Sequence, residues 1–288
     1  MAGKSRFIIA ESNIKKYFFE QDKVYSEEEL KQILNQKRMI WNLPISMNHT
    51  KFIEKLVERE VLVKNTINFS GYYPTKIRYA TNNSTVFHMA LSLASKSYLS
   101  HYTAAFLLGL TSQVPKTIYL TSEQSRKERT TDILLKQKDI DNAFKKPQRK
   151  SGAIGIHKEY SIVLHNGMFS NKLGVFSKGG LSYTNLERTL IDITVRPAYA
   201  GGVTRVLEIF ENSVDRISMN KLSAILKKLN YIYPYHQAIG FYLERVGMDE
   251  KNLSKLESIE KLNNFYLTYS MKDIEFNERW KIFFPKGI

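Results

Sequence analysis

Polar side chains suited to DNA contacts accompany a short amphipathic segment near the N-terminus. Residues 50–60 place apolar side chains at the spacing of one helix face, namely Phe52, Ile53, Leu56 and Val57. The first turn and the opposite face of such a helix can donate hydrogen bonds to bases and phosphates. We therefore expect base readout by Asn48, His49, Thr50 and Lys51, and contacts to the DNA backbone by Lys55 and Arg59. An ordinary solvated face is the alternative, because Glu54, Glu58 and Glu60 share the helix and would repel phosphate.

A hairpin is expected directly after this segment. Two extended stretches, at about 61–69 and 76–80, flank the turn 70–75, whose tip carries Tyr72 and Tyr73. Lys64, Lys76 and Arg78 flank the tip, so the hairpin has side chains able to touch sugar and phosphate in an adjacent groove. A plain edge hairpin, with lysines that discourage strand addition, is the alternative.

The charge balance favours a polyanionic partner. The 288 residues carry 43 Lys and Arg against 28 Asp and Glu, which gives a net charge of +15. A second candidate for contact with the DNA backbone is the run 145–150, which contains Lys145, Lys146, Arg149 and Lys150 and no acidic residue. A lysine-rich solvated surface would explain either feature equally well.

One expected helix start places an arginine near a carboxylate. Thr184 and Glu187 have the spacing of a capping box, and Arg188 and Asp192 have the i, i+4 spacing of a cross-turn ion pair. Carboxylates on a helix can perform acid–base catalysis, but we interpret this stretch as a structural helix start.

No pattern of an enzyme or metal site stands out. The six histidines do not fall into a ligand spacing, cysteine is absent, and no glycine motif for phosphate binding or nucleophile positioning occurs. We therefore expect no catalytic residue, no metal and no cofactor. No apolar run reaches the roughly 18 residues of a membrane span or suits a signal peptide, so we expect a cytoplasmic protein.

The elements around these residues predict two domains. Three helices, at about 11–20, 27–34 and 50–60, precede the hairpin, which is the order of a winged helix-turn-helix. We place this DNA-binding domain at residues 1–81 and a larger mixed α/β domain at 82–288, so the fold class is α+β. In the second domain we expect helices near 86–95, 100–109, 185–196, 203–213, 218–229 and 234–247, and strands near 117–121, 153–157, 161–168, 173–177, 265–270 and 279–284.

Two segments of the second domain resemble those of a known family. The stretch 100–121 consists of a small-residue helix, which Ser100 would cap, then a sharp stop and a β-branched strand. Its residues Ser100–Ala105, Gly109–Thr111 and Gln113–Thr121 are similar to the S-x-x-S/T-A … G-L-T-x-Q-x-P-x-x-I-Y-V segment of the abortive-infection AbiEi antitoxins. Glu187–Asp192, followed by Pro197 and by Gly201 and Gly202, resembles the family's E-R-T-L-I-D … P … G-G segment. The resemblance covers about residues 85–225, and the tail beyond about 250 carries no family motif.

The resemblance implies a role in two parts. Members of the family are described as type IV antitoxins, which repress their own operon by binding inverted repeats in its promoter. They also counteract a nucleotidyltransferase-like toxin encoded alongside, without a stable complex. We therefore expect an antitoxin of antiviral defence whose residues 1–81 bind the promoter, as a cooperative dimer on double-stranded DNA, while residues 82–288 act against the toxin. Two alternatives stay open: a nucleic-acid-processing enzyme targeted by a winged helix, and an antitoxin that binds its toxin directly.

Overall fold

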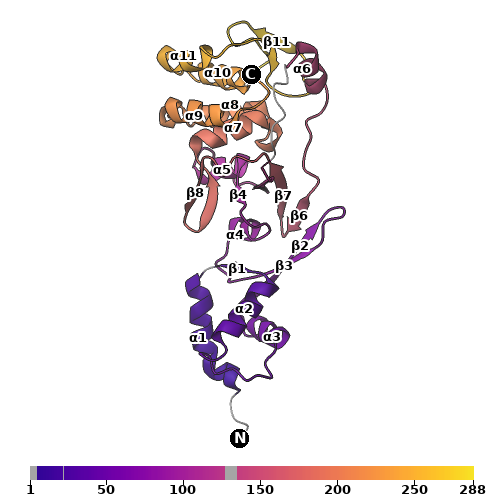
Figure 1. Cartoon of the computed structure of the whole chain (residues 1–288), viewed down its shortest axis with the longest axis vertical. Coiled ribbons are helices and arrows are strands. Elements are labelled where there is room, and N and C mark those ends of the chain that lie inside the picture. Colours follow the sequence, from indigo (N-terminus) through magenta and orange to yellow (C-terminus); the bar gives the residue numbers. More distant parts are fainter. Residues whose placement is uncertain (1–4, 22, 127–134) are drawn as a thin grey trace. The chain divides into compact units, whose positions relative to one another are not determined.

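The chain is a mixed α/β protein with two compact units. The computed structural model describes residues 5–21, 23–126 and 135–288 (Figure 1). These residues contain eleven α-helices, one large curled sheet and a second sheet of three strands. Unit 1 comprises residues 1–96 and 152–162, and unit 2 comprises residues 97–151 and 163–288. The boundary predicted at 81/82 therefore falls inside unit 1, which also includes a segment from far along the chain.

Three helices form the core of unit 1: α1 (Arg6–Gln21), α2 (Glu27–Lys37) and α3 (His49–Glu58). The start of α2 is fixed by Ser26, whose hydroxyl accepts from the Glu29 amide while the Glu29 carboxylate accepts from the Ser26 amide. The two residues thus form a capping box. The apolar faces of the helices meet at Trp41, which is 5% exposed and stacks on Phe52. Burial of these rings holds the three helices together.

The strands of unit 1 follow the order β1-β3-β2-β6. β2 (Val63–Phe69) and β3 (Lys76–Ala80) form the predicted hairpin, and β1 (Val24–Tyr25) pairs antiparallel with β3. β6 (Ile154–His157) pairs antiparallel with the end of β2, and helix α4 (Val86–Leu91) follows the hairpin. The hairpin therefore has a neighbouring strand on each side.

The strands of unit 2 follow the order β7-β5-β4-β9-β8. Their bounds are β4 (Tyr98–Leu99), β5 (Thr117–Glu123), β7 (Tyr160–Gly167, whose first residues belong to unit 1), β8 (Val175–Lys178) and β9 (Leu181–Thr184). β4 is two residues long and pairs antiparallel with β5 and parallel with β9. β9 ends at Thr184, and the next helix begins at Leu186, directly after its N-cap Asn185.

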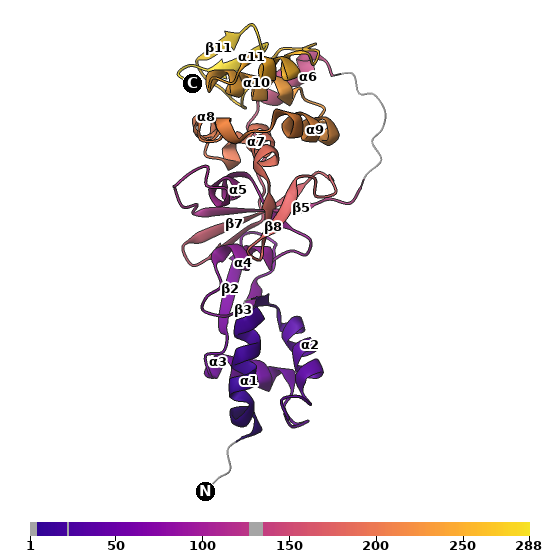
Figure 2. The ribbon, with the colours of Figure 1, turned by 90° about the vertical axis from the view of Figure 1, so that its left-hand side faces the viewer.

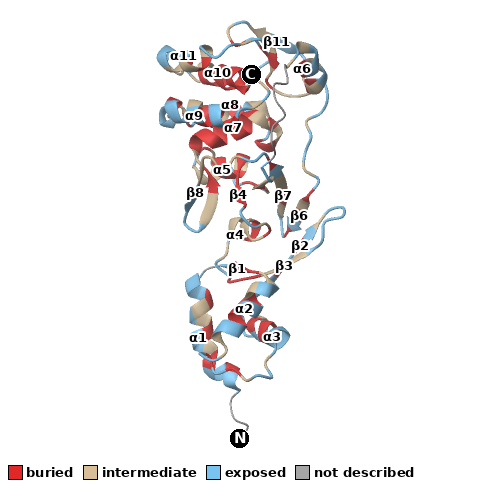
Figure 3. Cartoon of the chain, in the orientation of Figure 1, coloured by how far each residue is buried: buried red, intermediate tan, exposed pale blue. Residues whose placement is uncertain are grey.

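The helices of unit 2 lie in layers beside these strands. They are α5 (His101–Leu107), α6 (Gln137–Phe144), α7 (Leu186–Val195), α8 (Val203–Glu211), α9 (Met219–Leu229), α10 (Tyr235–Arg245) and α11 (Glu250–Glu257). Figures 1 and 2 both show α7, α8 and α9 between the strands and the pair α10 and α11. α7 and α10 are buried along almost their whole length (Figure 3). These two helices therefore lie at the centre of the core of unit 2, and the polar side chains that they carry are buried with them.

A small sheet covers α10 near the C-terminus. It consists of β10 (Phe265–Tyr266), β12 (Ile282–Pro285) and β11 (Ile274–Asn277), with β12 in the middle. Between β11 and β12 the fully buried Trp280 lies against Gly240 of α10, where an added Cβ would be 2.2 Å from the indole ring. The indole Nε1 donates to the Glu244 carboxylate at 2.9 Å. A glycine is therefore required in α10 for the ring to approach the helix backbone.

Most predicted elements are confirmed, with ends that differ by a few residues. The helices predicted in the second domain correspond to α4, α5, α7, α8, α9 and α10, and the strands to β5, β6, β7, β8, β10 and β12. Helices α6 and α11 and the short strands β1, β4, β9 and β11 were not predicted. In the described part of the chain, no helix is both long and apolar enough to cross a membrane.

Two of the predicted helix caps are wrong. α7 is capped by Asn185, whose side chain accepts from the Arg188 amide at 3.0 Å, whereas the Thr184 hydroxyl meets that of Thr189. Ser100 precedes α5 but makes no side-chain cap bond. Its hydroxyl instead contacts the Thr121 hydroxyl at 2.7 Å. In both places the hydroxyl that was predicted to cap the helix contacts another hydroxyl instead, a local one at Thr184 and a distant one at Ser100.

Candidate functional site

The first turn of α3 exposes the side chains that the sequence assigns to base readout. Asn48 is the N-cap, and its Oδ1 accepts from the Lys51 amide at 2.9 Å, so this oxygen is already engaged. His49, Thr50 and Lys51 are exposed in the turn that follows. On the other side of α3 the side chains of Phe52, Ile53 and Leu56 are buried in the core of unit 1. The packing thus turns a polar first turn outward, as predicted.

The cationic side chains of α3 and its C-cap differ in whether they already form an ion pair. Among the described residues, Lys51 has no ion-pair partner within 4.0 Å. Lys55 pairs with Glu58 at 2.6 Å, and Arg59 pairs with Glu11 of α1 at 2.8 Å. Exposed pairs of this kind contribute about 0–1 kcal/mol, so exchange of either carboxylate for a phosphate costs little.

The hairpin presents its aromatic tip and turns two of its cations inward. Tyr72 is fully exposed and Tyr73 is half exposed, and Lys64 is exposed on β2. Lys76 Nζ donates to the Leu93 carbonyl at 2.7 Å, and Arg78 donates through Nε and Nη2 to the Ser92 carbonyl. Burial lowers the pKa of Lys76. Both of these side chains therefore join the hairpin to the segment after α4.

Strand β6 braces the hairpin close to its tip. The Ser70 amide donates to the Ile154 carbonyl at 2.9 Å, and Phe69 lies opposite Gly155 in the strand register. A Cβ at Gly155 would be 2.8 Å from the Ile67 side chain, so the absence of a side chain lets β6 approach β2. The position of the tip thus depends on a segment about 80 residues further along the chain.

The basic run 145–150 belongs to unit 2. Lys145, Lys146, Arg149 and Lys150 are exposed and follow the end of α6. The Arg149 carbonyl accepts from Arg196 Nη1 at 2.9 Å, so the backbone of this run is attached to the residue that ends α7.

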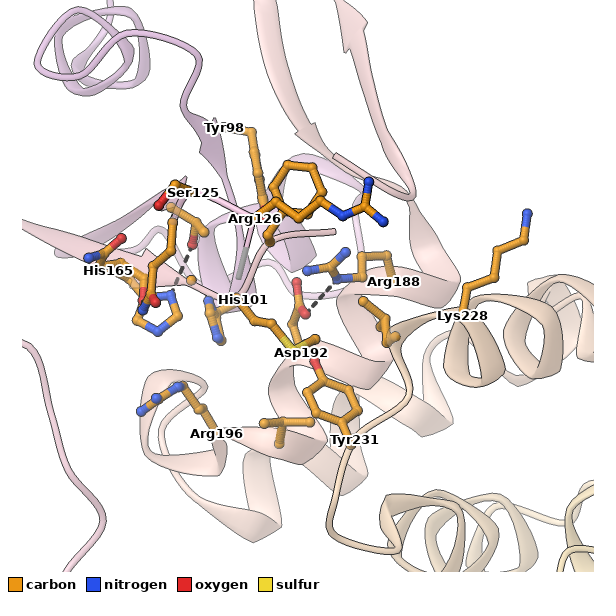
Figure 4. Close-up of a pocket in the computed structure, with 18 residues that line it drawn as sticks. Tyr98, His101, Ser125, Arg126, His165, Arg188, Asp192, Arg196, Lys228 and Tyr231 are labelled. Atoms are coloured by element: carbon orange, nitrogen blue, oxygen red, sulfur yellow. Dashed lines mark hydrogen bonds and ion pairs between the residues drawn. The ribbon is translucent and has the colours of Figure 1, made fainter. Parts of the chain in front are cut away.

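The arginine and carboxylate singled out in α7 line a pocket of unit 2. This cavity measures about 970 Å³ and is lined by residues of β4, α5, β5, β7, α7 and the end of α9. Figure 4 shows the two side chains joined at one wall, with the hydroxyl of Tyr231 pointing toward Asp192. The sequence predicted their ion pair but gave no sign of a cavity beside it.

Arg188 is held by three fixed acceptors. Its Nε donates to Asp192 Oδ1 at 2.7 Å, and its Nη1 donates to the Leu173 carbonyl at 2.8 Å and to Ser170 Oγ at 3.1 Å. Burial opposes its charge, but the Asp192 carboxylate together with Tyr98 and Tyr231 outweighs that effect and raises the pKa of Arg188. Burial likewise raises the pKa of Asp192, and the guanidinium offsets part of the rise. The predicted cross-turn pair is confirmed.

Two histidines that line the same pocket are linked by hydroxyls. His101 Nδ1 lies 2.8 Å from Ser100 Oγ, Ser100 Oγ lies 2.7 Å from Thr121 Oγ1, and Thr121 Oγ1 lies 3.3 Å from His165 Nδ1. Burial lowers the pKa of His165 to about 4 and that of His101 well below its usual range, so both rings are neutral at pH 7. Two hydroxyl protons cannot supply three hydrogen bonds. At least one of the two rings must therefore carry its proton on Nδ1.

In the described ranges of the chain, no three His, Asp or Glu side chains cluster closely enough to hold a metal ion. Asp192, the acidic residue among the described residues of the lining, is paired with Arg188, so the pocket suits anions better than cations.

Comparison with known proteins gives a likeness of fold. No protein-family model and no curated protein matches the chain. Among solved structures, the crystal structure of the RV2827C protein from Mycobacterium tuberculosis is similar, with a TM-score of 0.60 and 14% sequence identity. The match covers 96% of this chain and 90% of that one. The similarity therefore extends over nearly the whole of both chains and concerns the fold alone.

Proposed function

We propose that this protein is a DNA-binding repressor and antitoxin whose unit 1 is a winged helix. The observation that carries the proposal is the element order α1-β1-α2-α3-β2-β3, with β3 paired between β1 and β2. A winged helix has this arrangement, in which the third helix enters the major groove and the hairpin approaches the neighbouring groove. The net charge of +15 supports a polyanionic partner.

In this proposal α3 reads the DNA through its first turn. His49 and Thr50 supply groups for base edges, and Lys51 is an uncommitted cation at the same end of the helix. The wing contributes Tyr72 and Tyr73 at its tip together with Lys64. We leave Lys76 and Arg78 out of the interface because their nitrogens already hold the hairpin to residues 92 and 93.

The antitoxin part of the proposal rests on the AbiEi resemblance. The residues that carry it, in the stretches 100–121 and 187–202, build α5, β5 and α7 of unit 2. We assign to unit 2 the counteraction of a nucleotidyltransferase-like toxin, and to unit 1 the repression of the shared operon from inverted repeats. A division between separate units predicts that the two activities can be lost independently.

A gel-shift assay tests the repressor role. The full chain is titrated onto the duplex upstream of its own gene and onto a shuffled duplex of equal length, at several salt concentrations. The proposal predicts binding to the upstream duplex that is tighter by about a thousandfold or more. Equal, salt-labile affinity for both duplexes would show only a general polyanion interaction and would refute the repressor role.

Co-expression with the neighbouring gene tests the antitoxin role. Growth arrest by that gene's product should be relieved by this protein and also by its Lys51→Ala variant, because Lys51 belongs to unit 1. Loss of rescue in a Lys51→Ala variant that is still folded would refute the division of labour. Co-purification of a stable complex would favour an antitoxin that binds its toxin directly.

A further inference from the structure

The side chains that line the pocket of unit 2 carry an excess of positive charge. Arg188 and Arg196 line its walls, and the exposed Arg126 and Lys228 lie along it as well. Of the described residues that line the pocket, Asp192 alone is acidic, and it is paired with Arg188. The two histidines of the lining are neutral at pH 7. A ligand that brings several negative charges would complete this site.

Arg188 is set in place before any ligand arrives. Its side chain is 5% exposed and is fixed by Asp192, Ser170 and the Leu173 carbonyl. Among the described residues, its Nη2 has no hydrogen-bond partner. A guanidinium held this way loses little side-chain entropy when it binds an anion, which strengthens the contact.

Arg196, which is half-buried, is held on another part of the wall by one hydrogen bond and one ring contact. Its Nη1 donates to the Arg149 carbonyl, and its guanidinium lies 5.4 Å from the centre of the Tyr199 ring. The other nitrogens of Arg196 have no hydrogen-bond partner among the described residues. Two positioned guanidinium groups suit the oxygens of a phosphate chain, because the planar fork matches phosphate geometry.

The cavity is larger than a phosphate chain requires. Its volume of about 970 Å³ lies at the upper end of the range for sites that enclose a small organic ligand. Phe169, which is 41% exposed, and Tyr231 also line it and offer rings to a planar group. The site therefore combines a cationic wall with aromatic surface.

We propose that this pocket binds a free nucleoside triphosphate, with Arg188 and Arg196 on the phosphate oxygens and an aromatic side chain against the base. The four cations and the one carboxylate among the described lining residues give the pocket a net charge of +3, which suits the several negative charges of a triphosphate. The proposal concerns unit 2 alone and does not depend on DNA binding by unit 1.

Isothermal titration of the full chain tests the proposal. The probes are ATP, GTP, CTP and UTP, inorganic tripolyphosphate, and a short RNA with a 5′-triphosphate, each at physiological salt. Saturable one-to-one binding of at least one nucleotide in the micromolar range is expected. That binding should be tighter than binding of tripolyphosphate, and it should persist in Lys51→Ala.

Three variants place the ligand in the pocket. Arg196→Gln should weaken binding about tenfold or more, since it removes charged hydrogen bonds. Lys228→Gln should weaken it about two- to fivefold, as expected for an exposed charge. Lys227→Gln removes the same charge from the next position of α9, outside the lining, and should leave affinity unchanged. Fluorescence of the buried Trp280, measured in a Trp41→Phe background, confirms that each variant has a folded unit 2.

Several results would overturn the proposal. Absence of binding by all four nucleotides excludes it. Equal affinity for tripolyphosphate would show that the nucleoside makes no contribution to binding. A clear preference for the RNA would show that the ligand is the 5′-triphosphate end of an RNA and not a free nucleotide. Equal weakening by Lys227→Gln and Lys228→Gln, or no effect of Arg196→Gln, would show that binding is a general effect of surface charge.

Discussion

Breaking the buried pair in α7 should destabilise unit 2 more than any surface change. Arg188 and Asp192 are 5% and 6% exposed, and their joining atoms are 2.7 Å apart. Arg188→Met leaves a carboxylate buried without a cation, and Asp192→Leu leaves a guanidinium buried without an anion, and each change should cost about 3–5 kcal/mol. For a domain of this size such a loss lowers Tm by about 2–4 °C per kcal/mol, which predicts a drop of about 10 °C.

The double variant distinguishes the pair from its separate residues. Arg188→Met with Asp192→Leu removes both charges, so neither is left uncompensated, and its cost should fall short of the sum of the single costs by about 2–3 kcal/mol. The chain contains two tryptophans, Trp41 in unit 1 and Trp280 in unit 2. In a Trp41→Phe background, urea unfolding followed by fluorescence therefore reports unit 2.

Additive costs within about 0.5 kcal/mol would refute the reasoning. Additivity would mean that Arg188 stabilises α7 through the Ser170 and Leu173 contacts alone and that the carboxylate is solvated. A loss of less than about 1 kcal/mol in each single variant would also refute the reasoning, because exposed ion pairs contribute that little.

Three further predictions concern other parts of the chain. Burial lowers the pKa of His165 to about 4 in the folded state, so the unfolded chain binds the proton first as pH falls below about 6.5. Unit 2 should then lose up to about 3 kcal/mol between pH 7 and pH 4 from this group, and His165→Asn should show a shallower loss in urea midpoints measured across that range. Gly240→Ala should lower the Tm of unit 2 by several degrees, because its Cβ would lie 2.2 Å from Trp280, whereas Gly152→Ala in unit 1, where an added Cβ meets no atom within 4 Å, should leave the Tm of unit 1 unchanged. Arg78→Ala should cost unit 1 about 1–2 kcal/mol through loss of its bonds to the Ser92 carbonyl, measured by Trp41 fluorescence in a Trp280→Phe background, without changing the salt dependence of DNA binding.

Elements with a strong local pattern were predictable from the sequence. The helices α7 to α10 carry long apolar stripes, and the hairpin β2–β3 is local in sequence, so short-range signals sufficed. β4, with two residues, is defined only by its partners β5 and β9. The pairing of β6 with β2 joins segments about 80 residues apart and leaves no periodic signal.

The candidate sites were predictable to different degrees. The exposed first turn of α3 follows from one amphipathic helix, so its residues were found from spacing. The inward turn of Lys76 and Arg78 depends on carbonyls of residues 92 and 93, which no hairpin pattern reveals. In the pocket of unit 2, spacing predicted the pair of Arg188 and Asp192. Arg196, Lys228 and Tyr231 join them only through tertiary packing.

The most direct test of α3 as the reading helix is the salt dependence of binding to the upstream duplex for two lysine variants. Lys51→Ala removes the uncommitted cation of α3, and Lys16→Ala removes the same charge from α1. A phosphate contact by Lys51 predicts weaker binding and a log–log slope reduced by about one for Lys51→Ala, with Lys16→Ala unchanged. Identical slopes for both variants and the native protein would contradict the assignment of α3 to the DNA.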